Sequence, residues 1–267
     1  MIKQIIYTLF ITLLISSCTN SKRYIKLTNK EIVELIKQDA LNNKVCKILS
    51  PKGEVIDYKQ AVSYSPSKYY VDRYLDTKND SIILRFRKIK NTDITFNKTL
   101  QLYHTYGTYA DTINAKMNID CNQLDRLLSE ASLKDKENRL SGTIDPKVDA
   151  LNQRLLFNIF NSCDFHSSIK NKQESSHNAL TILLHANSEY QKKYLLQIKK
   201  AVKLGYLESK HLAYLYDKIA VGDNQPQKYG TQSTIDKDGN TILLPPYDNL
   251  DKVNKRRTKL GLPPITK

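Results

Sequence analysis

The periodicity of the apolar side chains changes near residue 119, and this change limits the folds open to the chain more than any other feature. Between residues 45 and 109 the pattern favours strands. In Ile82–Arg87, for example, every second side chain falls on one apolar face, as in a half-buried strand. From Ile119 the period becomes helical, with Leu124, Leu128 and Ala131 on one face. The sequence therefore predicts an α+β protein with a boundary between residues 110 and 118.

The first region, residues 28–115, is expected to be a small α+β unit. Thr28 and Glu31 have the spacing of a capping box, so a helix should begin there. Lys78-Asn79-Asp80 predicts the loop of a hairpin. Strands are expected over four segments rich in apolar residues, namely Val45–Leu49, Tyr69–Leu75, Ile82–Arg87 and Ile94–Tyr106.

The second region, residues 119–265, is expected to be mainly helical with a late hairpin. Asp145-Pro146 should open one helix, because proline is tolerated in a first turn. Ser188 and Gln191 have the spacing of a capping box for another helix, which Gly205 should end. Further helices are expected near 175–186, 209–219 and 249–260, and the hairpin around Lys237-Asp238-Gly239.

The N-terminus has the three parts of a secretory signal. Lys3 supplies a positive charge, Ile5–Ile15 is almost wholly apolar, and Ser16-Ser17 precede Cys18. This pattern resembles bacterial lipoprotein signals, in which the cysteine sulfur takes a diacylglycerol and becomes the mature N-terminus. The alternative is a membrane-spanning anchor, but the apolar run is shorter than the roughly 20 residues that a spanning helix needs. The sequence therefore predicts a signal peptide at 1–17 and lipidation of Cys18.

A lipid at Cys18 would anchor the protein to a membrane, because each buried methylene adds about 0.8 kcal/mol. Residues 18–27 are polar and basic and are expected to form a tether. The tether has no acidic cluster of the kind that resembles a surface-export signal in some lipoproteins. These features favour a cell-envelope location that faces the periplasm rather than the cell surface.

The chain has a formal net charge of +15, with 42 Lys and Arg against 27 Asp and Glu. In an envelope such a charge makes anionic polymers and an envelope protein the candidate partners, with nucleic acid less favoured. Compositional bias is the alternative reading, because the positive charge is spread along the chain without a block of like charges.

Four cysteines are present, and lipidation of one leaves Cys46, Cys121 and Cys163. An odd number cannot pair completely, and no two of them have the spacing of a metal-binding motif. Small buried thiols are the favoured reading. One disulfide among the three is the alternative, since the compartment permits it.

Several short motifs in the second region occur in a fixed order. They are Leu184-His185-Ala186-Asn187, Leu215-Tyr216-Asp217-Lys218, Pro226–Gln232, Arg256-Arg257 and Gly261-Leu262-Pro263. Together they resemble a bacterial family catalogued as domain of unknown function 6624. Upstream, Asp135 with Arg139 and Asp149 with Asn152 match acidic and asparagine positions of that family. The chain departs from the family pattern at Leu184 (usually Gln), Asn187 (usually Asp) and Lys218 (usually Arg).

Five polar residues of these motifs are expected to line one site. His185 is the candidate general base and Asp217 the carboxylate that orients it. The candidate ligand-binding residues are Gln227, Tyr229 and Gln232. The alternative is a structural role, in which His185 is buried and hydrogen-bonded and Gly230 supplies a turn with positive φ. His177 and His185 are too far apart along a helix to share a zinc ion, and no sequence pattern calls for a metal or a cofactor.

The sequence names no reaction. It lacks a P-loop, a dinucleotide-binding glycine motif, a nucleophile elbow and a paired-carboxylate motif. The favoured function is that of a membrane-anchored envelope lipoprotein that binds a ligand or partner through the polar cluster of its C-terminal domain. Two alternatives are a hydrolase-like enzyme that uses His185 and Asp217, and a scaffold whose basic surface holds the anionic wall or membrane.

Overall fold

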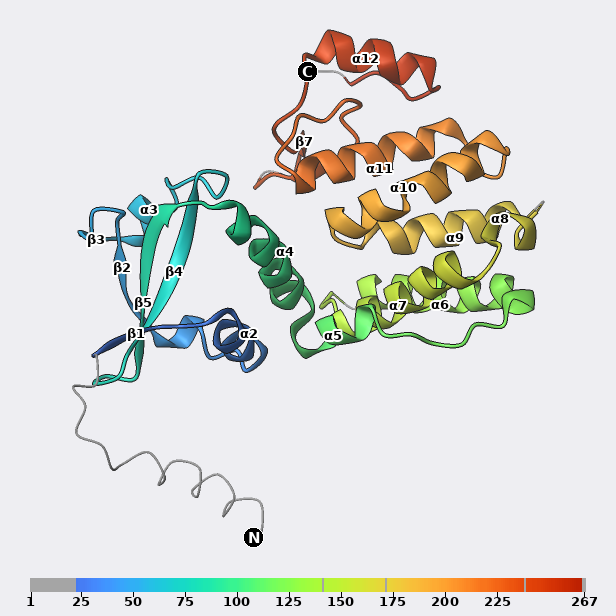
Figure 1. Ribbon diagram of the computed structural model, residues 1–267. Helices are drawn as coiled ribbons and strands as arrows, with labels where there is room; N and C mark the ends of the chain where they lie inside the picture. The colour runs from blue at the N-terminus through green and yellow to red at the C-terminus, as the bar shows by residue number, and fades with distance from the viewer. Residues whose placement is uncertain (1–22, 141, 171, 238, 266–267) are drawn as a thin grey trace. The chain divides into compact units, whose positions relative to one another are not determined.

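The computed structural model describes residues 23–140, 142–170, 172–237 and 239–265. The expected signal peptide and Cys18 lie outside the described residues. The chain divides into two compact units after Leu100 (Figure 1). This division is earlier than the predicted boundary, because Tyr106, Ala110 and Ile113 belong to the core of the second unit. In the described part of the chain, no helix is long and apolar enough to cross a membrane.

The first unit is built on a five-stranded mixed sheet of order β1-β4-β5-β2-β3. Its strands are β1 (Tyr24–Lys26), β2 (Val45–Leu49), β3 (Val55–Ile56), β4 (Tyr69–Asp76) and β5 (Ser81–Lys88). Strands β2 and β5 run parallel and the other neighbours antiparallel. Its helices are α2 (Asn29–Lys37), α3 (Tyr58–Ala61) and the start of α4 (Asn91–Tyr106). The core of this unit forms around Ile32, Tyr70, Ile82 and Phe96.

Two predictions for this unit were wrong. The segment Ile94–Tyr106 lies within helix α4 instead of forming a strand. Asp93 explains part of the difference, because its carboxylate accepts a hydrogen bond from the Lys90 amide at 2.7 Å in the first turn. The end of the expected tether is also not free, since residues 24–26 form the edge strand β1 against β4.

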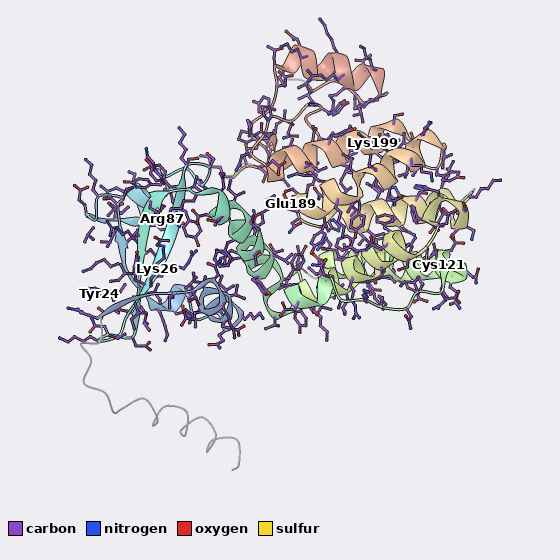
Figure 2. The ribbon with its side chains drawn as sticks, viewed as in Figure 1. Tyr24, Lys26, Arg87, Cys121, Glu189 and Lys199 are labelled. Atoms are coloured by element: carbon purple, nitrogen blue, oxygen red, sulfur yellow. A yellow bond between two sulfur atoms is a disulfide. The ribbon has the colours of Figure 1, made fainter. Side chains whose placement is uncertain are left out.

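A buried ion network joins the sheet of this unit to helix α4. Arg87, labelled in Figure 2, donates to Asp72 at 3.0 Å and to Asp93 at 2.6 and 2.8 Å. Its guanidinium also lies 4.6 Å from the ring centroid of Tyr70. Arg87 lowers the pKa of the Asp93 carboxyl, chiefly through this hydrogen bond. The network fixes the point at which β5 turns into α4.

The second unit is mainly helical, as predicted, and ends with a small hairpin and one more helix. Its helices are α5 (Ala110–Ile113), α6 (Leu124–Leu140), α7 (Pro146–Ser162), α8 (Phe165–Ser168), α9 (Gln173–Leu184), α10 (Ser188–Lys203), α11 (Ser209–Gly222) and α12 (Leu250–Lys259). The hairpin pairs β6 (Ser233–Ile235) with β7 (Thr241–Leu243). From α6 and α7 the helices stack through α9, α10 and α11 toward α12 (Figure 1). The α+β fold class is therefore confirmed.

The core of the second unit is continuous from α5 to α11. Leu128, Leu156, Ile159, Leu183 and Ile198 are among its fully enclosed side chains. Aromatic rings extend this core: the Phe157 ring stacks on Tyr190 at 4.5 Å and on Tyr194 at 4.8 Å between centroids. Such burial is the main source of stability for a helical unit of this size.

A disulfide links Cys121 to Cys163, so the favoured reading of three small buried thiols was wrong (Cys121 is labelled in Figure 2). Cys46 is free and exposed. The bond ties the turn before α6 to the end of α7, where the Cα atoms lie 5.7 Å apart. Sequence spacing could not reveal this pairing, because the two cysteines are 42 residues apart.

Helix ends follow the predicted caps with one exception. Thr28 and Glu31 form the expected capping box, and Asp145 caps α7 with Pro146 in its first turn. Ser188, the predicted cap of α10, is instead its first helical residue, and the cap is Asn187, whose side chain accepts from the Tyr190 amide at 3.2 Å. Gly205, at a φ of 78°, follows the end of α10.

Candidate functional site

His185 lies at the carboxyl end of α9, directly after the apolar run Leu180–Leu184. Its Nδ1 is 2.8 Å from an oxygen of Asp135 on α6. On the other side of the ring, Arg139 Nε donates to Nε2 at 3.3 Å. The apolar run itself is largely buried, yet 29% of the His185 side chain remains exposed. His185 is therefore anchored at both nitrogens but is not sealed from solvent.

Arg139 connects His185 to a second carboxylate. Its Nη2 donates to both oxygens of Asp149 at 3.0 Å, and it lies 3.5 Å from Asp135. Asn138, the neighbour of Arg139 on α6, donates to Asp149 at 3.3 Å. We call Asp135, Arg139, Asp149 and His185 the His185 cluster. Asp135 and Arg139 are four residues apart and so share one face of α6.

The hydrogen bonds define the protonation of the imidazole. Because Arg139 Nε can only donate, His185 Nε2 must be its acceptor and carry no proton. The ring proton is then on Nδ1, where it is donated to Asp135. With a neutral imidazole, two carboxylates and one guanidinium, the cluster carries a net charge of −1.

One donor of the cluster is left over. Within the described residues, Nη1 of Arg139 is buried and has no hydrogen-bond partner. The Arg139 side chain as a whole is 24% exposed, whereas that of Asp135 is only 4% exposed. An unpaired buried donor is unfavourable by about 1–3 kcal/mol. The cluster therefore keeps one unused directional donor beside a partly open imidazole.

Two glutamines and a tyrosine hold the backbone on which His185 sits. Gln153 Nε2 donates to the His185 carbonyl at 3.4 Å, and Gln153 Oε1 accepts from the Tyr106 hydroxyl at 3.0 Å. Gln191 Nε2 donates to the carbonyls of Leu184 and Ala186 at 3.1 and 2.8 Å. Burial raises the pKa of Tyr106 to about 12, so its hydroxyl stays protonated as a donor. The turn that carries His185 is thus fixed on both sides.

Asp217 is not the partner of His185. Its side chain on α11 is completely buried and accepts hydrogen bonds from the amides of Lys228, Tyr229 and Thr231 and from the Thr231 hydroxyl, at 2.8 to 3.2 Å. Both oxygens are used in this way. Asp217 therefore fixes the loop 228–231, and the carboxylate that orients His185 is Asp135.

Gln227 is equally buried and has a similar role. Its Nε2 donates to the carbonyls of Gln232 and Leu244 at 2.9 and 2.5 Å, and its Oε1 accepts from the Gln232 amide at 2.8 Å. The Gln227 backbone also pairs with Pro246 and Asp248. Because both polar atoms of the Gln227 side chain are hydrogen-bonded within the chain, this residue stabilises the loop and does not bind a ligand.

Tyr229 and Gln232 lie on the same loop and are half-buried. The side-chain Nε2 of Gln232 donates to the Thr231 hydroxyl at 3.2 Å. From α12, Arg257 donates to the carbonyls of Tyr229 and Gly230 at 2.8 and 3.2 Å. Gly230 has a φ of 60°, which confirms the predicted turn. The motifs of residues 217–263 therefore form one structural unit, which we call the C-terminal lock.

The sequence motifs thus separate into two groups, and the predicted site mixed them. His185 belongs to the cluster with Asp135, Arg139 and Asp149, while the other four predicted residues belong to the C-terminal lock. Asp135, Arg139 and Asp149 were noted only for their match to a family pattern. The spacing of Asp135 and Arg139 on one helical face was the signal that could have joined them to a site.

The three departures from the family pattern, at Asn187, Lys218 and Leu184, have little effect on the candidate site. Asn187 caps α10, and aspartate serves equally well as a cap. Lys218 is exposed on α11 and is outside the His185 cluster. Leu184 precedes His185, and its carbonyl accepts from Gln191 whatever the side chain. None of the three replaces a residue of the cluster.

In the described part of the chain, no three His, Cys, Asp or Glu side chains are grouped so that they could hold a metal. The His185 cluster contains the hard oxygens of two carboxylates, but Arg139 neutralises one of them and occupies the space between them. The cluster is therefore a network of hydrogen bonds and ion pairs.

Comparison with known proteins agrees with the motif pattern. Residues 116–267 match the sequence profile of a family of unknown function, DUF6624. No curated protein and no solved structure matches the chain significantly. The matched segment covers more than half of the chain and includes both the His185 cluster and the C-terminal lock. The protein therefore belongs to the family of unknown function DUF6624.

Proposed function

We propose that the protein is a membrane-anchored envelope lipoprotein whose helical domain binds a polar ligand at the His185 cluster. The observation that carries this proposal is the unused Nη1 donor of Arg139 beside the partly exposed imidazole of His185. The ligand should therefore offer an acceptor oxygen.

The surroundings favour a rigid binding site over a mobile one. Asp135 and Asp149 hold Arg139, and the glutamine contacts hold the backbone of His185. A preorganised guanidinium loses little freedom when it binds a planar acceptor, and a neutral carbonyl oxygen suits a cluster of net charge −1 better than a further carboxylate. The net positive charge of the chain supports anionic envelope polymers as the partner class, with an envelope protein as the alternative.

A pull-down with purified cell-wall fragments tests this function. The full chain should bind the fragments, and binding should weaken with salt because exposed charge contacts are screened beyond about 10 Å at 0.1 M. Arg139→Gln should weaken binding, whereas Lys218→Ala, outside the cluster, should not change it beyond the loss of one exposed charge. Equal binding by Arg139→Gln and the parent would contradict the assignment of the site.

A hydrolase-like enzyme is the second candidate, with His185 as general base. The 2.8 Å contact between His185 and Asp135 favours it, since a carboxylate at Nδ1 orients an imidazole for proton transfer. Asp135 takes the role that the sequence assigned to Asp217. For catalysis Arg139 must release Nε2, which argues for binding as the first choice.

Thermal melting of His185→Gln separates the two candidates. A general base whose side chain does not stabilise the fold can be replaced with little change in melting temperature. An imidazole that is bonded at both nitrogens leaves partners unsatisfied when it is replaced, at about 1–3 kcal/mol. We expect the destabilised outcome, and an unchanged melt would favour the enzyme.

The lipid anchor is a separate part of the proposal and is supported by the signal pattern before Cys18. Cys18→Ala should abolish acylation and leave the signal uncleaved. Metabolic labelling with a palmitate analogue measures this, and equal label on the mutant and the parent would contradict it. A periplasm-facing location is proposed on the same basis.

A further inference from the structure

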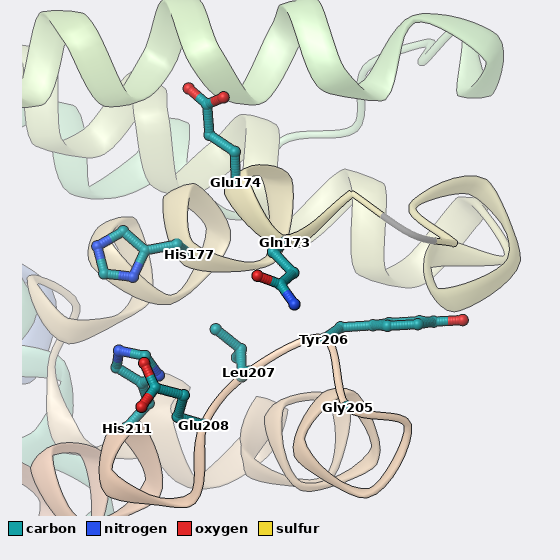
Figure 3. Close-up of a pocket in the computed structure, with 8 residues that line it drawn as sticks. All are labelled: Gln173, Glu174, His177, Gly205, Tyr206, Leu207, Glu208 and His211. Carbon is teal, nitrogen blue, oxygen red and sulfur yellow. The ribbon is translucent and has the colours of Figure 1, made fainter.

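A pocket of about 390 Å³ opens on the helical unit, away from the His185 cluster. Gln173, Glu174 and His177 from the first turns of α9 line one side, and Glu208 and His211 line the other. Figure 3 shows the imidazoles of His177 and His211 facing each other at one end of this pocket. Helix periodicity connects His177 only with His185, because 34 positions separate His177 from His211.

The separation of the two rings fits a shared metal ion. Their centroids are 5.3 Å apart. A zinc ion bonded to one nitrogen of each ring at about 2.1 Å lies about 3.2 Å from each centroid, so a tetrahedral angle places the centroids about 5.2 Å apart. Figure 3 shows a nitrogen of each ring turned toward the space between the rings. The two imidazoles are thus already spaced as a pair of ligands.

The state of His211 also suits a metal ligand. Its Nδ1 is buried and has no hydrogen-bond partner among the described residues. An imidazole nitrogen without another partner is free to bind a metal ion.

We propose that His177 and His211 form a binding site for a divalent transition-metal ion of the zinc class. The protein supplies two ligands, because no third His, Cys, Asp or Glu among the described residues completes a metal cluster with them. Water completes the coordination, and the exposed carboxylate of Glu208 adds negative charge at the edge of the site. Imidazole ligands favour zinc, copper and nickel over magnesium and calcium.

The two glutamates of the pocket have different places. Glu208 lines the same side of the pocket as His211, is exposed, and pairs with Lys210 at 2.9 Å. The Glu174 carboxylate points away from the two imidazoles in Figure 3. Glu174→Gln is therefore a matched control, since it removes one charge from the same pocket without touching a ligand.

Zinc titration of the full chain in detergent tests the site by calorimetry and thermal melting. The protein carries Cys46→Ser throughout, because the exposed thiol is itself a zinc ligand. We expect one zinc ion per chain and a melting temperature that rises with zinc concentration. His177→Ala should weaken zinc binding by roughly tenfold or more, while Glu174→Gln stays within about twofold of the parent.

His177 is exposed, so His177→Ala should fold normally and its result can be interpreted directly. Failure of the parent to bind zinc at 1 mM would overturn the proposal. So would equal zinc affinity of the parent and His177→Ala. Loss of zinc binding in His185→Gln but not in His177→Ala would place the metal at the His185 cluster and would also overturn it.

Discussion

Replacement of Asp217 by asparagine should destabilise the helical unit and release the C-terminal lock. The carboxylate is completely buried and accepts from four donors, three of them backbone amides. An asparagine has the same shape, but its single oxygen faces only part of this set. Whichever way the new amide is turned, the backbone amide of Lys228 or that of Thr231 loses its acceptor, because the Tyr229 amide contacts both oxygens. The asparagine NH2 group that faces it has no acceptor either, so two buried donors are left unsatisfied.

The size of the effect follows from these contacts. Each buried donor without an acceptor is unfavourable by about 1.5 kcal/mol, so the backbone amide and the asparagine NH2 group together give about 3 kcal/mol. For a unit of this length, 1 kcal/mol lowers the melting temperature by roughly 2–4 °C, so a fall of roughly 6–12 °C is expected. Desolvation acts in the opposite direction, because the neutral amide is easier to bury than the carboxylate.

Circular dichroism at 222 nm measures the melt, and hydrogen exchange locates the change. The amides of Lys228, Tyr229 and Thr231 should exchange faster in Asp217→Asn, while those of α7 keep their protection. Lys218→Ala is the matched control, because it changes the next, exposed residue and should melt like the parent. A melt of Asp217→Asn within 2 °C of that control, or above it, would refute the reasoning about the lock.

Three further predictions concern the covalent and backbone constraints of the helical unit. Loss of the Cys121–Cys163 bond should destabilise it by up to about 4 kcal/mol, as expected for a loop of 42 residues; melting with and without reductant checks this, and equal melts would contradict it. Gly230→Ala should destabilise the unit in a thermal melt, because the new methyl carbon would lie 2.7 Å from Ile265 and φ is positive; an unchanged melt would show that the loop adapts. A fragment of residues 91–267, which keeps α4 whole, should melt cooperatively with a helical spectrum; a disordered spectrum would show that it depends on the first unit.

Local patterns were sufficient for most of the fold. The capping box of Thr28, the Asp145-Pro146 helix start and the turn at Lys78-Asn79-Asp80 depend on neighbours within a few residues, and all three were confirmed. Helix α4 was missed because its alternation of apolar and polar residues fits a strand as well as a helix. Its neighbours in the fold decide between the two, since Phe96 and Leu100 pack into the core of the sheet.

The site was harder to predict because its contacts are long-range. His185 meets Asp135 across 50 positions, and the disulfide joins cysteines 42 positions apart. Sequence order instead suggested Asp217, which follows the same motif series. A buried aspartate before a loop and a buried aspartate beside a histidine are indistinguishable in sequence. Only the hydrogen-bond partners separate the structural carboxylate from the one that orients the imidazole.

This separation changes the meaning of the Pro226–Gln232 motif, which is the most specific of the series. Its polar residues satisfy one another and Asp217, so the requirement for them is explained by the lock alone. The His185 cluster is different, because Arg139 retains a buried donor after every described contact is counted. A functional test should therefore begin at Arg139 and His185, and a stability test at Asp217. If Arg139→Gln leaves both the melt and ligand binding unchanged, the cluster has neither role and the pocket of His177 and His211 becomes the first candidate.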